Sequence, residues 1–238
     1  MEYVKFLPAG ESALTVEFSR EISEEVNRKI RFLASHLEKE KLNGIKEAIP
    51  TFRSITVFFD PLVIPKKRVV RHIESILDGY TPDTAGEKRI FKIPVCYEGE
   101  YAPDMKDVEE ITGLSAEEII EIHTGRDYLI YMLGFLPGFP YLGGMDERIE
   151  APRLDSPRTA IPAGSVGIGG KQTGIYPLAS PGGWRLIGRT PLKIYDSERE
   201  EPIFYRAGDY IRFVRISEEE FIKISSDSSY TVECEVEK

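Results

Sequence analysis

The stretch that decides the fold of this chain begins Gly134-Phe-Leu-Pro-Gly-Phe-Pro-Tyr-Leu-Gly-Gly144. From Gly134 to Gly188, 55 residues hold 12 of the 20 glycines and 7 of the 16 prolines of the 238-residue chain. Glycine allows positive φ and close backbone approach, whereas proline fixes φ. This composition predicts a rigid, irregular surface made of tight turns between short strands.

The residues on either side of this stretch are typical of short strands separated by Gly and Pro turns, a pattern that favours a barrel or a sandwich. A helix over Ser115–His123 is indicated by a capping box of Ser115 and Glu118, and a second box (Ser217, Glu220) opens a short helix near the end. A further short helix is predicted at Val108–Ile111. The predicted strands are Arg89–Tyr97, Tyr128–Leu133, Ile203–Tyr205, Tyr210–Ile216 and the alternating run Tyr230, Val232, Cys234, Val236, which we expect to have one buried face.

The first third of the chain alternates between strand and helix patterns. Leu14, Val16 and Phe18 alternate with polar residues, which predicts a half-buried strand. Two further strands are expected at Ile45–Ile49 and Phe52–Phe59. Apolar residues at helical spacing predict two helices, the second of which follows Pro65. Their inward residues are Ile22, Val26, Ile30, Leu33 and Leu37 in the first, and Val69, Ile73 and Ile76 in the second.

A turn-rich segment, Gly79–Gly86, separates these two patterns. We therefore expect an α+β protein of two domains, an N-terminal α/β-sandwich-like domain over residues 1–86 and a larger β domain over residues 87–238.

Composition excludes several classes of protein. The formal net charge of −9 argues against a general nucleic-acid binder. No apolar run approaches the roughly 18 residues of a membrane helix, and the N-terminus lacks the pattern of a secretion signal. Two cysteines, Cys96 and Cys234, make no disulfide framework and are both expected to be structural. We expect a soluble, cytoplasmic protein.

One segment reverses the acidic balance of the chain. From Ser156 to Tyr195 there is no Asp or Glu, yet three arginines and two lysines are present. Such an asymmetry indicates a site for an anionic ligand or a docking surface for an acidic protein partner. Arginines without local carboxylates are expected to face one concave surface. The alternative is that each arginine pairs with a carboxylate from elsewhere in the domain. The candidate substrate- or anion-binding residues are Phe139, Tyr141, Arg158, Gln172, Thr173, Tyr176, Trp184, Arg185 and Arg189.

Known catalytic patterns do not match. The phosphate-binding loop pattern fails at two of its four fixed positions when laid on Ser165–Gln172, although backbone N–H groups in Gly164–Gly170 could still bind an anion. His36, His72 and His123 have no spaced ligand partners, so no metal site is indicated. His123 falls in the last turn of its helix, where a cation suits the helix dipole. The catalytic residues stay unidentified.

The order of five motifs carries a resemblance to a known family. They are Gly134–Gly144, Pro157-Arg158 with Ile161-Pro-Ala-Gly-Ser-Val166, Gln172-Thr-Gly-Ile-Tyr-Pro177, Ser180-Pro-Gly-Gly-Trp184, and Gly188-Arg-Thr-Pro191. Over essentially the whole chain, the sequence resembles the family of the 5-oxoprolinase B subunit, also labelled allophanate hydrolase subunit 1 and KipI-type histidine-kinase inhibitor.

This resemblance implies a C-terminal cyclophilin-like β-barrel, without implying prolyl isomerase activity. It also implies that the chain works together with a second cyclophilin-like chain, which is the C subunit of 5-oxoprolinase, and with the A subunit. The complete enzyme opens 5-oxoproline to glutamate with ATP, which the subunits share. Two alternatives stay open: an inhibitor that binds a sporulation histidine kinase, and the carboxyltransferase-like half of a biotin-dependent urea carboxylase system. We expect the isolated chain to be inactive or nearly so.

Overall fold

The computed structural model describes residues 4–81 and 88–237. Their contacts divide the chain into two compact units, Met1–Gly86 and Glu87–Lys238. The segment Gly79–Gly86, predicted from the sequence as the domain boundary, lies outside the described residues from position 82 onward. Whether each unit folds as an independent domain stays a prediction.

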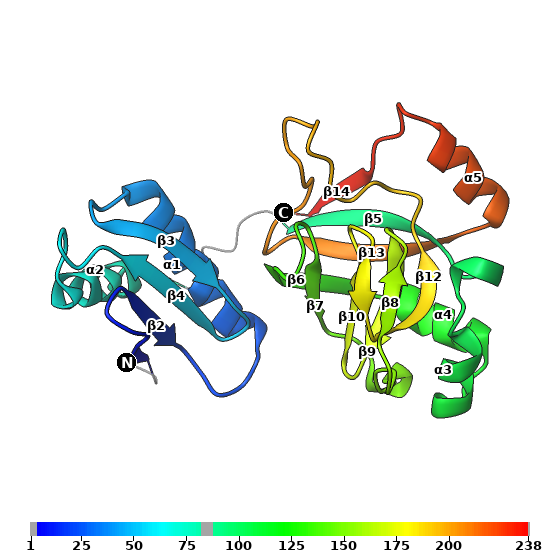
Figure 1. The fold of residues 1–238 in the computed structure, drawn as a ribbon, viewed down its shortest axis with the longest axis horizontal. Coiled ribbons are helices and arrows are strands. Elements are labelled where there is room, and N and C mark those ends of the chain that lie inside the picture. Colours follow the sequence, from blue (N-terminus) through cyan, green and yellow to red (C-terminus); the bar gives the residue numbers. More distant parts are fainter. Residues whose placement is uncertain (1–3, 82–87, 238) are drawn as a thin grey trace. The chain divides into compact units, whose positions relative to one another are not determined.

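The first unit contains a four-stranded antiparallel sheet with the strand order β1-β2-β4-β3. Two helices pack their buried residues with those of the sheet in one core, as Figure 1 shows. The elements are β1 (Lys5–Pro8), β2 (Ala13–Glu17), α1 (Glu24–Glu40), β3 (Ile45–Pro50), β4 (Ser54–Phe59) and α2 (Lys66–Asp78).

The two helices follow the predicted apolar spacing. Val69, Ile73 and Ile76 are the buried residues of α2, as expected. The prediction for Ile22 is wrong, because Ser23 caps α1 by accepting a hydrogen bond from the Val26 N–H. Ile22 therefore precedes the helix and is 57% exposed.

The second unit is dominated by one large, strongly curved sheet with the strand order β10-β9-β12-β5-β13-β6-β7, to which β14 adds beside β5. The strands at the two ends of this order, β10 and β7, lie close together, so the sheet nearly closes into a barrel. This confirms a mixed α+β protein with a barrel-like sheet and is consistent with the cyclophilin-like barrel that the resemblance implies. The strands are β5 (Lys88–Cys96), β6 (Asp127–Leu133), β7 (Pro140–Gly143), β9 (Ser165–Gly169), β10 (Gln172–Ile175), β12 (Arg185–Arg189), β13 (Tyr210–Ile216) and β14 (Glu233–Glu237).

A small two-stranded sheet and several helices complete the second unit. In this small sheet β8 pairs antiparallel with β11, outside the large sheet. Both predicted capping boxes are present, at the N-termini of α4 and α5. The elements are η1 (Gly99–Tyr101), α3 (Met105–Thr112), α4 (Ala116–Thr124), η2 (Glu147–Ile149), β8 (Arg158–Ile161), β11 (Ser180–Gly182) and α5 (Glu218–Ser226). In residues 4–81 and 88–237, no helix is long and apolar enough to cross a membrane.

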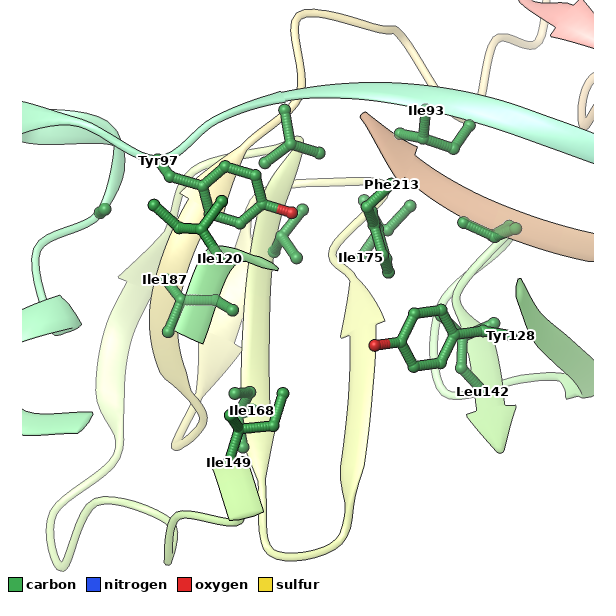
Figure 2. Packing of buried hydrophobic residues seen from close by; sticks show 14 of the residues in the cluster. Ile93, Tyr97, Ile120, Tyr128, Leu142, Ile149, Ile168, Ile175, Ile187 and Phe213 are labelled. Atoms are coloured by element: carbon green, nitrogen blue, oxygen red, sulfur yellow. The ribbon is translucent and has the colours of Figure 1, made fainter. Parts of the chain in front are cut away.

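The barrel interior is filled by branched aliphatic and aromatic side chains from most of the strands and from α3 and α4. Figure 2 shows Ile93, Ile168 and Phe213 among the residues that meet there. These three side chains are at most 1% exposed. The interior is therefore a packed core and leaves the surface of the barrel as the place for a site.

Two expectations for the end of the chain are wrong. Ile203–Tyr205 forms no strand, and Ile203 makes only an isolated bridge to Tyr195. The last strand has no buried residue, and both Cys234 and Val236 are exposed. This strand is attached through its antiparallel pairing with β5 and through ion pairs made by its glutamates.

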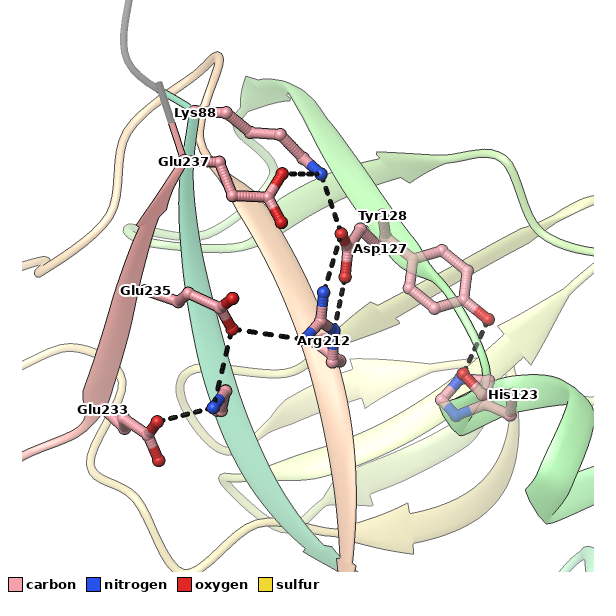
Figure 3. Close-up of polar contacts among 9 residues, drawn as sticks. Lys88, His123, Asp127, Tyr128, Arg212, Glu233, Glu235 and Glu237 are labelled. Carbon is pink, nitrogen blue, oxygen red and sulfur yellow. Dashed lines mark hydrogen bonds and ion pairs between the residues drawn. The ribbon is translucent and has the colours of Figure 1, made fainter.

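Ion pairs hold β14 to the sheet, as Figure 3 shows. Glu237 and Asp127 both accept from Lys88 at 2.9 Å, and Glu233 accepts from Lys92 at 2.5 Å. Arg212 reaches Asp127 with two nitrogens, at 2.6 and 3.0 Å. Burial raises the pKa of Asp127, but hydrogen bonds from Arg212 and Lys88 outweigh it and lower the pKa overall. In this strand the alternating glutamates therefore form ion pairs with cations of the neighbouring strands.

Candidate functional site

Three of the predicted site residues form one buried aromatic cluster. Phe139 precedes β7, Tyr176 follows β10 and Trp184 precedes β12, and the ring centroids of Phe139 lie 5.4 Å from Tyr176 and 5.5 Å from Trp184. Their exposed fractions are only 2 to 5%. Tyr141, half-buried, packs edge-on against Phe139 at 5.2 Å. The sequence thus brings these residues together, but as a packed cluster, not as the open wall of a cavity.

The glycines of β9 and β10 make room for Trp184. A Cβ at Gly169 would collide with the indole ring, and one at Gly174 would lie 3.1 Å from it. A Cβ at Gly167 would lie 3.3 Å from the Trp184 Cβ. The glycine-rich pattern therefore serves packing at these positions. Since Ser165–Gly169 pairs on both sides, with β10 and β12, the expected anion-binding cluster of N–H groups in Gly164–Gly170 is replaced by a strand.

The expectation that the arginines lack carboxylate partners is wrong for Arg158 and Arg185. Two nitrogens of Arg158 donate to the two carboxylate oxygens of Asp104, at 2.8 and 2.5 Å. Arg185 pairs with Asp107 at 2.5 Å. Both carboxylates come from the start of α3, far away in the sequence. For these two arginines, the alternative prediction of pairing with a carboxylate from elsewhere in the domain is therefore confirmed.

Asp104 lies at the centre of this contact. It is 4% exposed and also accepts a hydrogen bond from the Leu186 N–H at 2.7 Å, while its own N–H donates to the Leu186 carbonyl at 3.0 Å. Arg158 and Asp104 therefore brace β8, α3 and β12 against each other. Bidentate pairs of this kind are among the stronger polar contacts in proteins.

The two lysines of the acid-free segment are paired as well. Lys171 lies 3.5 Å from Glu150, and Lys193 lies 2.8 Å from Asp196. Arg189 donates to the Ala163 carbonyl at 3.0 Å and forms no ion pair within the described ranges of the chain. Arg189 lies four positions after Arg185 on the same strand, which corresponds to about 13 Å. Arg189 is thus well separated from the cluster around Arg185.

Gln172 and Thr173 open β10 and differ in their surroundings. Gln172 is half-buried and pairs with Gly169 across the hairpin. Thr173 is fully buried, and its hydroxyl donates to the Gly167 carbonyl at 3.1 Å. The Thr173 side chain faces the barrel core, where His123 contacts it.

His123 links two hydroxyl groups inside the barrel. Its Nδ1 lies 2.8 Å from the Tyr97 hydroxyl and its Nε2 lies 2.9 Å from the Thr173 hydroxyl. Because the Thr173 proton is given to Gly167, Thr173 accepts from Nε2–H and Tyr97 donates to Nδ1. Burial lowers the pKa of His123 to about 3. The expected cation at the end of this helix is therefore a neutral core residue.

Sequence reasoning missed Arg153. Its guanidinium lies 5.9 Å from the centre of the Trp184 ring, and the side chain is exposed. Within residues 4–81 and 88–237 it forms no ion pair with a carboxylate. Burial raises the pKa of Tyr176, and the positive charges of Arg153 and Arg158 oppose this shift. Arg153 was overlooked because Asp155 follows it and places it just outside the acid-free segment.

Three further features of the described residues bear on a possible metal or ligand site. No three His, Cys, Asp or Glu side chains among them are arranged to hold a metal ion. The Ser180 hydroxyl is buried without a hydrogen-bond partner. A groove of about 710 Å³ lies in the other unit, between α1 and β3, and Lys41 and Glu47 are among its lining residues. None of the predicted site residues lines it.

The chain is similar to a known protein family and to several known proteins. The family described as "Carboxyltransferase domain, subdomain C and D" matches residues 4–205. The chain is 46% identical to the 5-oxoprolinase B subunit of Bacillus subtilis over 230 residues, which cover 92% of this chain and 96% of that protein. It is 26% identical to urea amidolyase of Saccharomyces cerevisiae, covering 94% of this chain but only 14% of that protein.

The chain is also similar to a solved structure. The crystal structure of TTHA0988 superimposes with a TM-score of 0.78 at 37% identity, covering 86% of this chain. The match spans 40% of that protein, so the chain corresponds to less than half of it.

Proposed function

Because the chain belongs to the family of the 5-oxoprolinase B subunit, we propose that it is the B subunit of an ATP-dependent enzyme that opens 5-oxoproline to glutamate. The observation that carries this proposal is the 46% identity to the Bacillus subtilis protein over nearly the full length of both chains. The cyclophilin-like identity of the barrel and the arrangement as two independent domains belong to the same proposal.

Within residues 4–81 and 88–237, four groups that could act on a substrate are paired with a cation or buried. Asp104 and Asp107 are paired with arginines. His123 is fully buried and neutral. Cys96 is buried, and burial raises the pKa of its thiol. A nucleophile or base that acts on 5-oxoproline would therefore come from the A or the C subunit.

A lactam amide is resonance-stabilised, and phosphorylation of its oxygen by ATP would turn it into a better electrophile. Such a step requires cations and N–H donors around the phosphates. The residues of the acid-free segment fit the phosphates of ATP poorly. The cations of Arg158, Arg185 and Lys171 are already paired, and β9 is hydrogen-bonded on both sides. We therefore infer that the nucleotide binds to a partner chain.

The contribution of this chain is then binding and positioning. The part that we propose for this role is the barrel surface around the aromatic cluster, where Tyr141, Gln172 and Arg185 are half-buried. The buried residues Phe139, Thr173, Tyr176 and Trp184 would support this surface without touching a ligand, because at most 5% of each is exposed. Arg158 would do so through Asp104, and Arg189 would lie at its margin.

A second candidate is the carboxyltransferase half of a urea carboxylase system. The match to the carboxyltransferase family and to the yeast urea amidolyase favours it. The lower identity and the much smaller share of the yeast protein make it the weaker candidate.

Co-expression with the A and C subunits of the same organism separates these proposals. The purified complex should release glutamate from 5-oxoproline only when ATP is present, and the isolated chain should release none. Carboxyl transfer from carboxybiotin to urea by the same complex, without glutamate release, would favour the second candidate.

A further inference from the structure

The backbone on both sides of Arg153 is tied to the start of β12. Before it, the Pro152 carbonyl accepts a hydrogen bond from the Arg185 Nε at 3.0 Å. After it, the Leu154 N–H donates to the Gly183 carbonyl at 2.7 Å. Because both neighbours are held by residues next to Trp184 in the sequence, Arg153 has a fixed position beside this tryptophan.

The Arg153 side chain lies over the aromatic cluster. Its guanidinium is 5.9 Å from the centre of the Trp184 ring, and Trp184 itself is only 5% exposed. Burial raises the pKa of Tyr176, while the charges of Arg153 and Arg158 oppose this shift, so both guanidinium groups lie near the Tyr176 hydroxyl. A buried, closely packed ring therefore supports an exposed cation.

Arg153 is also the cation of this surface whose charge is not neutralised. Arg158 and Arg185 are paired with Asp104 and Asp107. Within residues 4–81 and 88–237, no carboxylate forms an ion pair with Arg153. An isolated surface arginine is ordinarily only solvated, but this one has a backbone fixed on both sides and a ring beneath its side chain. Its N–H donors are therefore largely oriented before a ligand arrives.

The chemistry of 5-oxoproline matches such a group. The molecule carries one charge, on the carboxylate of its ring, and a guanidinium can donate two parallel N–H groups to the two oxygens of a carboxylate. The carboxylate and the lactam carbonyl are attached to ring carbons on either side of the ring nitrogen. A contact to the carboxylate therefore leaves the lactam carbonyl open to groups that another subunit supplies.

We propose that Arg153 binds the carboxylate of 5-oxoproline and thereby positions the substrate on the barrel surface around the aromatic cluster. The identity of the substrate rests on the proposed function. The charge that Arg153 requires in a ligand follows from the contacts of this side chain. Trp184 has a positioning role, because its buried ring supports the guanidinium.

Steady-state kinetics of the co-expressed complex, with 5-oxoproline varied at saturating ATP, tests this proposal. Arg153→Ala should raise the KM for 5-oxoproline about tenfold or more, because a charge-assisted contact is lost. The kcat should fall by less than about threefold, and the KM for ATP should not change. Arg153→Lys, which keeps the charge without the planar pair of donors, should have an intermediate KM.

The matched control is Arg206→Ala, which removes another exposed arginine of the same unit. Arg206 precedes β13, which begins beside Ile90 near the start of β5, whereas β12 meets β5 at its last residue, Cys96. This variant should have the kinetic constants of wild type.

A binding measurement on the isolated chain uses Trp184, the single tryptophan, as its probe. Titration with 5-oxoproline should change the tryptophan emission until it saturates, and Arg153→Ala should abolish this response. The amide of 5-oxoproline, which has the same ring without the charge, should give no response at the same concentrations. An equal response to the amide would show that the carboxylate is not recognised.

The outcomes separate this proposal from the proposed function. If the wild-type complex releases glutamate and Arg153→Ala has an unchanged KM for 5-oxoproline, whatever its kcat, the carboxylate contact is wrong and the proposed function stands. If the wild-type complex releases no glutamate, the proposed function fails and the fluorescence titration decides. A response to 5-oxoproline that requires Arg153 then supports the carboxylate site, and the lack of any response overturns it.

Discussion

Arg158 and Asp104, 54 positions apart in the sequence, form a two-hydrogen-bond ion pair whose carboxylate also accepts the Leu186 N–H. Arg158 is the first cation of the acid-free segment, and its charge is satisfied inside the chain. Asp104 begins α3, so the pair connects three elements at the edge of the barrel.

Asp104→Ala should destabilise the second unit by about 3 kcal/mol, because it leaves the Arg158 guanidinium and the Leu186 N–H without their shared acceptor. Urea unfolding monitored by the fluorescence of Trp184 measures this loss. The matched control is Asp107→Ala, whose exposed pair with Arg185 should contribute less than about 1 kcal/mol. Equal effects of the two substitutions would show that Asp104 is not a brace.

Gly169→Ala should destabilise the second unit by about 1–3 kcal/mol, because the added Cβ collides with the Trp184 indole and overpacks the cluster. The emission spectrum of this single tryptophan should shift as the ring moves. Gly183→Ala is the control, because its nearest neighbour, in Pro157, would be in ordinary contact at 3.6 Å. If both variants behave as wild type, the glycines have another role.

The stability of the second unit should fall on acidification between about pH 6.5 and 3. In the unfolded chain His123 takes up a proton as the pH falls through about 6.5. In the folded chain it stays neutral down to a pKa of about 3, so protons favour the unfolded state across this window.

His123→Gln removes this contribution. The slope of its unfolding free energy against pH between about 6 and 4 should be smaller than that of wild type by about 1.4 kcal/mol per pH unit. His36→Gln, in the other unit, controls for the loss of a histidine. Identical slopes for wild type and His123→Gln would contradict a buried neutral histidine.

Limited proteolysis tests the domain boundary. Cleavage should begin within Gly79–Gly86 and release stable fragments of about 10 and 17 kDa. First cuts inside Ile90–Leu133 would show that the boundary lies elsewhere.

The acidic final strand should detach as ionic strength rises. Its contacts with Lys88, Lys92 and Arg212 are ion pairs that are at least partly open to solvent, so salt screens them. Hydrogen exchange of the amides of β14 should accelerate between low salt and about 1 M salt, while those of β13 should stay protected. Unchanged protection of β14 would mean that its backbone pairing with β5 is sufficient.

Local patterns were enough to predict most of the elements. The spacing of Val69, Ile73 and Ile76 predicted the buried face of α2, and both capping boxes are present. These signals depend on residues that are close in sequence. The burial of the last strand was predicted wrongly because alternation alone does not show whether other elements cover either face, and here the glutamates make the side-chain contacts.

The site was harder to predict because it depends on long-range contacts. The acid-free segment suggested free arginines, but Asp104 and Asp107 reach Arg158 and Arg185 from about 50 and 80 positions away. The aromatic cluster was predicted as a group, yet its burial follows from the glycines beneath Trp184.

The proposed function is tested most directly by titrating this chain into a fixed mixture of the A and C subunits with saturating ATP and 5-oxoproline. The rate of glutamate release should be near zero without the chain, rise with its concentration and saturate at a fixed stoichiometry. Full activity of the other two subunits alone, or glutamate release by this chain without them, would contradict the account.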